Sequence, residues 1–193
     1  MIEAIRLRVN LDDTNPLIWR VLLVPKDITF YKLHHTIQIA MGWTNSHLFE
    51  FKLEGYRVGE IYDNLDGLDE GLIINARETK LSDLIDKENE TFQYEYDFGD
   101  GWEHSIIIEK NEFLEDSHQL PFCISGELKC PPEDCGGIPG FYNLLKILSD
   151  KKHEEYKETK FWVGGKFDTL EFDLLKINKQ LKKIDKYIKS IEE

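Results

Sequence analysis

The sequence lacks the features of a membrane or secreted protein. No apolar run approaches the roughly 18 residues that a helix needs to cross a bilayer. The first residues, MIEAIRLRV, lack the apolar stretch of a signal peptide. The three cysteines are too few, and odd in number, for a disulfide framework. We therefore expect a soluble, cytoplasmic protein without membrane association, whose cysteines are reduced thiols or metal ligands.

The sequence also has few basic residues relative to acidic ones. Lys and Arg total 24 against 37 Asp and Glu, which gives a formal net charge of −13. A chain of this sign repels phosphate backbones, so we do not expect nucleic-acid binding. Lysines accumulate between residues 176 and 189, but without arginine, and this pattern favours a solvated helix face.

Familiar catalytic motifs are absent too. The chain has no phosphate-binding Gly-Lys-Ser/Thr loop, no Gly-x-Ser-x-Gly elbow and no paired-histidine helix. What is present is a composition with 41% hydrophobic and 12% aromatic residues in a chain of 193 residues. This composition predicts one folded domain that spans residues 1–193.

The hydrophobic pattern predicts a mixture of strands and helices. Alternating apolar residues, bounded by turn residues, indicate strands, whereas apolar residues at helical spacing indicate helices. The pattern predicts a single α+β domain with a mixed, mostly antiparallel sheet flanked by helices. The predicted strands are 5–9, 17–24, 48–53, 57–61, 72–75 and a hairpin over 92–109, and the predicted helices are 29–42, 81–85, 139–148 and 151–160.

The C-terminal segment predicts one long helix over residues 169–191. Asp168 and Glu171 have the spacing of a capping box at its start. Apolar residues then follow in steps of four and three, which is a heptad seam. The seam has two interpretations, a helix packed on the sheet or a zipper through which the chain self-associates. Its members are Leu170, Leu174, Ile177, Leu181, Ile184, Ile188 and Ile191.

A hairpin is predicted where the sequence reads YEYDFGDGWEH, residues 94–104. A two-residue turn at Asp100 and Gly101 would place Asp97 opposite His104. A carboxylate beside an imidazole suits a general base or a metal-bound histidine, although it also occurs as an ion pair that fixes register. A three-residue loop would instead pair Tyr96 with His104. Asp97, Asp100 and His104 are therefore the candidate catalytic residues.

The three cysteines follow the spacing Cys123-x6-Cys130-x4-Cys135. Cys130 and Cys135 come near the spacing of a zinc-binding pair, and His104, His118 or an aspartate would complete the ligand set. The alternative interpretation is a rigid loop over 123–137, shaped by prolines and glycines, in which the cysteines pack as small apolar groups.

Six segments together resemble one known family, the plasmid pRiA4b ORF-3-like proteins. The resemblance covers nearly the whole chain and implies a single α+β domain built on a sheet flanked by helices. It supplies no reaction. Relatives often carry a second histidine after His47, where this chain has Phe49, so the resemblance implies that a metal pair there is broken. The segments are 16–20, 41–47, 80–84, 94–104, 130–137 and 167–168.

Taken together, these observations predict a binding or interaction module. Its site would be formed by the 94–104 hairpin and the 123–137 loop, with a contribution from His47. One alternative is a zinc-dependent enzyme, hydrolytic in character, in which Asp97 orients His104. Another is an oligomer scaffold assembled through the 169–191 helix. The predicted binding residues are His47, Tyr96, Trp102, Glu133 and Asp134, and the predicted metal ligands are Cys130, Cys135 and His104.

Overall fold

The computed structural model describes residues 1–61, 73–85, 87–88, 90–115 and 119–192. Its strands are β1 (Ile2–Leu11), β2 (Ile18–Pro25), β3 (Phe49–Leu53), β4 (Tyr56–Gly59), β5 (Ile73–Asn75), β6 (Thr91–Tyr96), β7 (Trp102–Leu114) and β8 (Phe122–Glu127). These described strands form one sheet in the order β5-β4-β3-β6-β7-β1-β2-β8. All neighbours are antiparallel except β4 and β5, which are parallel.

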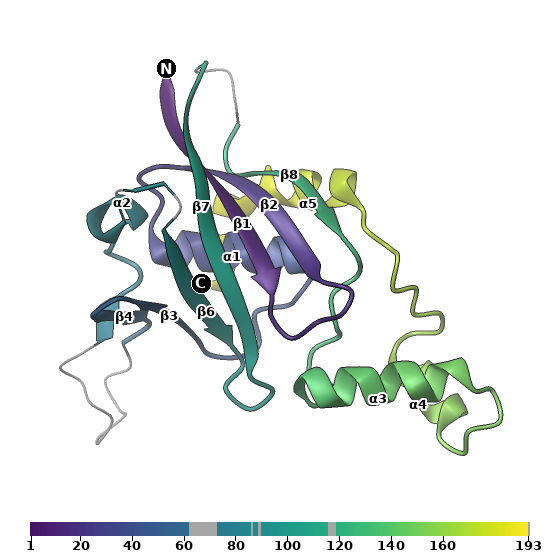
Figure 1. Cartoon of the computed structure of the whole chain (residues 1–193). Coiled ribbons are helices and arrows are strands. Elements are labelled where there is room, and N and C mark those ends of the chain that lie inside the picture. The colour runs from purple at the N-terminus through teal and green to yellow at the C-terminus, as the bar shows by residue number, and fades with distance from the viewer. Residues whose placement is uncertain (62–72, 86, 89, 116–118, 193) are drawn as a thin grey trace.

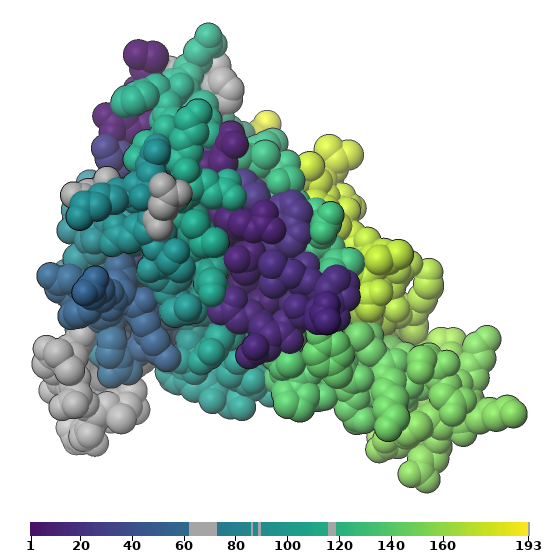
Figure 2. Space-filling model, viewed as in Figure 1, coloured from purple at the N-terminus to yellow at the C-terminus, as the bar shows by residue number. Residues whose placement is uncertain are grey.

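The helices are α1 (Phe30–Met41), α2 (Leu81–Leu84), α3 (Gly137–Ser149), α4 (Tyr156–Trp162), α5 (Leu174–Leu181) and α6 (Ile184–Ile191). Figure 1 shows α1 behind the sheet, and both α5 and α6 contact α1. The helices α3 and α4 contact each other and form a projecting arm at one edge of the molecule (Figures 1 and 2). Sheet and helices together confirm the predicted α+β class.

The core lies between the sheet and α1. Burial alternates along β7, where Trp102, His104 and Ile106 are buried and Glu103 between them is exposed, so one face of the sheet carries the core. Every residue of α1 except Lys32 is buried. The helix is enclosed because the sheet covers one side of it and α5 and α6 contact it from another.

The caps predicted for the first helix are confirmed. The Thr29 hydroxyl accepts a hydrogen bond from the Lys32 N–H at 3.2 Å, and Gly42 ends the helix with φ of +89°. A left-handed residue at this position is the usual stop for a helix and favours glycine. The chain therefore leaves α1 sharply and enters segment 43–48, which leads to β3.

The last helix starts later than its capping-box pattern predicted. Asp173, and not Asp168, caps α5, and the residues just before it are not helical. Tertiary contacts account for the difference. The Phe172 ring lies under the Arg20 guanidinium at 4.7 Å, and a Cβ at Gly126 would meet that ring at 2.8 Å. These contacts keep the preceding segment in a non-helical conformation, which includes a turn where the Glu171 N–H donates to the Asp168 carbonyl at 3.1 Å.

The predicted single long helix is also interrupted, because α5 ends at Leu181 and α6 begins at Ile184. Lysines occupy the break and suit a helix, so the sequence gives no sign of it. Ile177, Leu181 and Ile184 of the heptad seam are 8%, 1% and 2% exposed within the core. The middle of the seam thus packs inside the chain, whereas its end members Leu170 and Ile191 are exposed, and self-association stays a prediction.

Part of the predicted 123–137 loop is a strand. Strand β8 forms an edge of the sheet beside β2, where Leu22 pairs with Cys123. The following helix, α3, begins at Gly137, two residues before the predicted start at Pro139. Within the part of the chain that the structure describes, no helix is both long and apolar enough to span a bilayer.

Candidate functional site

The hairpin has neither of the two predicted registers. Tyr94 pairs with His104 and Tyr96 pairs with Trp102, so residues 97–101 form the connection. The predicted contact between Asp97 and His104 is therefore wrong. Asp97 closes the longer loop through its own backbone, because its carbonyl accepts from the Gly101 N–H at 2.6 Å.

His104 lies inside the core and not at a site. Its side chain is fully buried, and Nδ1 lies 3.0 Å from the Trp102 carbonyl oxygen and 3.2 Å from that of Tyr94. Burial lowers the pKa of His104 to about 4, so the ring is neutral near pH 7. The Trp43 ring packs against it edge-on at 5.4 Å. His104 is therefore shielded from any substrate in solution.

The predicted zinc ligands do not come together. The Arg20 guanidinium donates to the Cys130 sulfur at 3.2 Å, and the same thiol donates to the Met41 sulfur at 3.2 Å. Burial, together with the Asp100 carboxylate, raises the pKa of the Cys135 thiol to about 12. Metals bind the thiolate, so this environment opposes coordination. Among the described residues, no group of three close metal-ligating side chains includes a cysteine.

Two further candidate zinc ligands are Cys123 and His118. Burial raises the pKa of Cys123, the third thiol, to about 11. His118, considered as a fourth ligand, lies outside the described residues. The structure thus corrects the predicted set of Cys130, Cys135 and His104 and favours the interpretation in which the cysteines pack as small groups.

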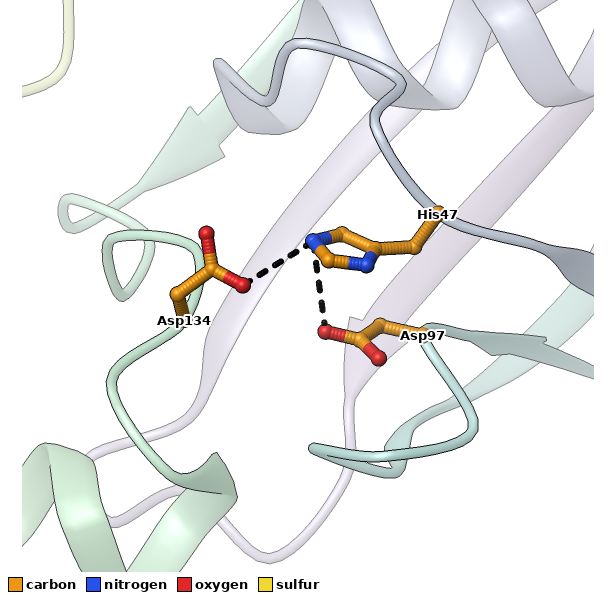
Figure 3. Close-up of side chains that lie close together, drawn as sticks. All are labelled: His47, Asp97 and Asp134. Atoms are coloured by element: carbon orange, nitrogen blue, oxygen red, sulfur yellow. Dashed lines mark ion pairs between the residues drawn. The ribbon is translucent and has the colours of Figure 1, made fainter.

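Three other side chains do converge, namely His47, Asp97 and Asp134 (Figure 3). His47 Nε2 lies 3.1 Å from Asp134 Oδ1 and 3.6 Å from Asp97 Oδ2. One donor atom from each residue lies within 4.8 Å of the other two. Nε2 is shielded from solvent but makes no well-aligned hydrogen bond with any described residue. An imidazole nitrogen thus faces two carboxylates.

The three side chains come from separate parts of the fold. His47 lies in segment 43–48, Asp97 follows β6, and Asp134 lies between β8 and α3. Asp97 and Asp134 have φ of +56° and +58°, in the left-handed region. Residues other than glycine are uncommon there, and such backbones concentrate at functional sites. The exposed fractions of the side chains are 27% for His47, 10% for Asp97 and 69% for Asp134.

One oxygen of Asp97 is committed to its own loop. Oδ1 accepts from the Gly99 N–H at 3.0 Å, and the Asp100 N–H lies 3.4 Å away. The second oxygen, Oδ2, is the one that faces His47. The loop therefore fixes the orientation of the carboxylate while one oxygen remains directed at the imidazole.

Glu133 connects the end of β6 with segment 43–48 through hydrogen bonds. Its Oε1 accepts from the Tyr96 hydroxyl at 2.5 Å. Its Oε2 accepts from the Thr44 N–H at 2.9 Å and the Thr44 hydroxyl at 2.6 Å. The Ser46 N–H in turn donates to the Tyr96 oxygen at 3.0 Å. Burial, and next the hydrogen bond to Glu133, raises the pKa of Tyr96, so the hydroxyl keeps its proton.

The hairpin loop also contacts the start of α3 directly. The Gly136 N–H donates to Asp100 Oδ2 at 3.1 Å. Gly137 has φ of +65°, and a Cβ there would lie 2.2 Å from the Asp100 carbonyl oxygen. Glycine is therefore required both by the backbone angle and by the space.

A hollow of about 500 Å³ opens beside His47 and Asp97. None of the described residues that line it is a lysine or an arginine, which favours a cation over an anion. The lining residues are Asn45, Ser46, His47, Leu48, Glu60, Asp97, Phe98 and Gly99.

The predicted site residues thus divide into two groups. His47, Tyr96, Asp97, Asp100, Glu133 and Asp134 gather where segment 43–48, the hairpin loop and the chain before α3 meet.

Trp102 and His104 instead lie in the core, with Trp102 fully buried. Phe49, the position highlighted by the family resemblance, also lies in the core, where it stacks on His34 at 3.7 Å. Sequence reasoning missed the convergence of His47 with the two aspartates. The available signal was that Asp97 and Asp134 each precede a glycine-rich turn.

The comparisons with known proteins agree with this fold. The sequence matches the family described as plasmid pRiA4b ORF-3-like protein over residues 3–176. The uncharacterized protein y4hQ of Sinorhizobium fredii is 39% identical over 178 residues, which are 92% of this chain and 90% of that protein. A crystal structure of a protein of unknown function, MM3350 from Methanosarcina mazei Go1, is similar with a TM-score of 0.81 and 34% identity, and the match covers 91% of this chain and 97% of that one. This chain belongs to the plasmid pRiA4b ORF-3-like family.

Proposed function

We propose that this protein is a binding module that holds a divalent metal ion between the 94–104 hairpin and the 123–137 segment. The ligands are His47 Nε2 and one carboxylate oxygen each from Asp97 and Asp134. The observation that carries the proposal is the environment of Nε2, which is shielded from solvent and faces two carboxylates without a well-aligned hydrogen bond.

A simple ion pair explains this geometry less well. A protonated imidazole donates along its N–H axis, and a stabilising contact with a carboxylate would be short and aligned. The 3.1 Å separation from Asp134 is short, but it lacks that alignment. A cation placed between the three donors would use the nitrogen lone pair and both carboxylates, and it would balance the two negative charges.

The mixed donor set selects among metals. Calcium and magnesium favour sites made of oxygen ligands alone. An imidazole nitrogen with carboxylates instead suits zinc, manganese or iron. Three protein ligands leave coordination positions for water or for a bound molecule.

The experiment is a calorimetric titration of the full chain with Mn²⁺ and, separately, with Zn²⁺. The variants are Asp134→Asn and Asp97→Asn, because asparagine also tolerates a positive φ. The matched control is Asp13→Asn, at another exposed aspartate with φ of +59°.

The expected result is one ion per chain, bound at least about tenfold more weakly by each site variant and unchanged in the control. Binding that is equal in Asp134→Asn and the wild type, or no stoichiometric binding of either metal, would overturn the proposal.

A second candidate function is metal-dependent hydrolysis at the same site. The observation that favours it is the 69% exposure of the Asp134 side chain, which keeps one side of the site open to solvent. A metal ion there would lower the pKa of a bound water and supply a nucleophile. Hydrolysis of a p-nitrophenyl ester by the Zn²⁺-loaded protein, and its loss in Asp134→Asn, tests this function. Equal rates in the two proteins would contradict it.

A further inference from the structure

A second hollow, lined by none of the three proposed metal ligands, lies between α1, α5, the start of α6 and two further segments of the chain. We call it the lysine groove, and it has a volume of about 870 Å³. This volume falls within the range of small-molecule sites, about 300–1,000 Å³. Its boundaries are the C-terminal end of α1, the 129–133 segment, the 163–173 segment, α5 and the start of α6 with its cap Lys183.

The floor of the lysine groove is apolar. It includes Met41 and Trp43, which are 5% and 7% exposed, together with the partly buried rings of Phe167 and Phe172. The Trp43 ring nitrogen is not available to a ligand, because it already donates to the Pro131 carbonyl at 2.9 Å. A bound molecule therefore gains mainly by covering apolar surface here.

The acidic side chains of the groove are already engaged. The Lys129 ammonium pairs with Glu171 at 2.5 Å. The Asp173 side chain caps α5 by accepting from the Lys176 N–H at 2.9 Å. Glu133 accepts from Tyr96 and Thr44, as described above.

Two cations of the rim remain. Among the described residues, neither Lys176 nor Lys183 has a carboxylate within ion-pair distance of its ammonium group. Both are exposed and line the groove. The chain has a net charge of −13, but these two lysines give the rim a local positive charge.

The arginine of the groove is not free to bind a phosphate bidentately. Arginine is the side chain best suited to bidentate phosphate binding. The Arg20 guanidinium at the groove donates instead to the carbonyl oxygens of Trp19, Ala40, Glu127 and Leu128, at 2.7–2.8 Å.

We propose that the lysine groove binds a small carboxylate with an apolar body, such as a medium-chain fatty acid. The apolar body covers Met41, Trp43 and Phe167, and the carboxylate lies at Lys176 and Lys183. This inference rests on the groove alone and is independent of the proposed metal site.

The test is a calorimetric titration of the full chain with decanoate, below the concentration at which decanoate forms micelles. The variant is Lys176→Gln combined with Lys183→Gln, both at exposed positions. The matched control is Lys186→Gln combined with Lys189→Gln, which removes the same charge outside the groove lining. The neutral comparison ligand is 1-decanol.

The expected result is one saturable site whose affinity for decanoate falls at least about tenfold in the groove variant and less than about twofold in the control. Decanol binds the wild type more weakly than decanoate. Amide NMR shifts on binding fall in residues 39–44 and 176–187. Absence of saturable binding, equal loss in the control, or shifts elsewhere would each overturn the proposal.

Discussion

Glu133 shows at the level of one residue how the site is held together. Its two oxygens accept hydrogen bonds from Tyr96 and Thr44, and so connect the end of β6 with the segment after α1. Because the acceptor is charged, these are stronger than ordinary neutral hydrogen bonds. Asp134, the next residue in the chain, is a proposed metal ligand, so Glu133 also positions the site.

Replacement of Glu133 by glutamine is expected to destabilise the protein. An amide oxygen can replace one acceptor, but the NH₂ group would then face a donor. Hydrogen bonds to charged groups contribute about 1.5–3 kcal/mol, so the free energy of unfolding should fall by about 1–3 kcal/mol. Chemical denaturation measures it, with the exposed Glu154→Gln as control. Equal stabilities of both variants would contradict this role.

At the residue scale, the sequence identified most of the site residues but paired them wrongly. Asp97 was expected opposite His104, because Asp100 and Gly101 favour a two-residue turn. The loop is longer, and Asp97 itself takes a positive φ within it. Each residue of β6 therefore pairs with a different residue of β7 from the one predicted. His47 and Asp134 are distant from Asp97 in sequence, and only the assembled fold brings these residues together.

At the element scale, the start of α3 depends on two close approaches of the backbone. Gly137 lies against the Asp100 carbonyl, and Gly140 lies against the Cys135 carbonyl, where a Cβ would be 1.8 Å away. The loop before α3 is thereby packed directly on the hairpin, and Asp134 is kept near His47.

Gly137→Ala should therefore cost more than the same change at Gly164. Both glycines have a positive φ, +65° and +76°, but a Cβ at Gly164 meets nothing within 4 Å. The change at Gly164 should cost about 1–2 kcal/mol from the backbone angle alone. At Gly137 the clash adds to this, for a total of roughly 3 kcal/mol or more. Thermal or chemical unfolding that ranks the two variants equally would contradict the packed junction.

The C-terminal seam provides a second test at this scale. Leu181 is 1% exposed and Leu175 is 84% exposed. Leu181→Ala should lower the free energy of unfolding by about 2–5 kcal/mol, because it leaves a cavity. Leu175→Ala should change it by less than about 0.5 kcal/mol.

The denaturation midpoint of the wild type should not depend on protein concentration, since the buried middle of the seam packs within one chain. A midpoint that rises with concentration would instead indicate a zipper between chains.

Helices and strands were predicted correctly where local residues determine their ends, and incorrectly where contacts between distant segments determine them. Thr29 and Gly42 bound the first helix as expected, because capping is local chemistry. The start of α5 was missed because Phe172 packs on Arg20 instead of entering the helix. Strand β8 was missed because its pairing with β2 joins segments that are far apart in sequence.

At the scale of the whole molecule, three histidines of the described residues are buried in the core, His34, His35 and His104. Burial lowers the pKa of His35 and of His104 to about 4, and it lowers that of His34 well below its usual value. The groups near His35 are Glu60, Glu192 and Arg77, and His35 lies near His34. Among the described residues, neither ring nitrogen of His35 has a hydrogen-bond partner.

These histidines predict that stability falls in mild acid. Their pKa values are lower in the folded than in the unfolded protein, so the unfolded chain binds more protons below about pH 6.5. His35 and His104 should each remove roughly 1 kcal/mol of stability per pH unit between about pH 6.5 and pH 4, and His34 should lower stability in the same direction. His35→Phe should make the stability near pH 5 depend less steeply on pH. Denaturation curves at several pH values measure it, and equal slopes in the variant and wild type would contradict this account.

At the same scale, composition predicted one folded domain and the hydrophobic pattern predicted an α+β class, and the structure and its solved neighbour confirm that class. The sequence did not predict how the helices are layered on the sheet. The nearly complete burial of α1 follows from the position of α5 and α6, which the sequence predicted as one helix without a fixed partner.

The most direct test of the proposed metal site is paramagnetic NMR of the full chain with less than one equivalent of Mn²⁺. We predict that amide signals broaden together in three segments that are far apart in sequence, residues 45–48, 97–99 and 134–136, and that Asp134→Asn removes the effect. Broadening spread over other acidic surfaces, such as residues 154–158, or none that saturates, would contradict the claim that His47, Asp97 and Asp134 form one metal site.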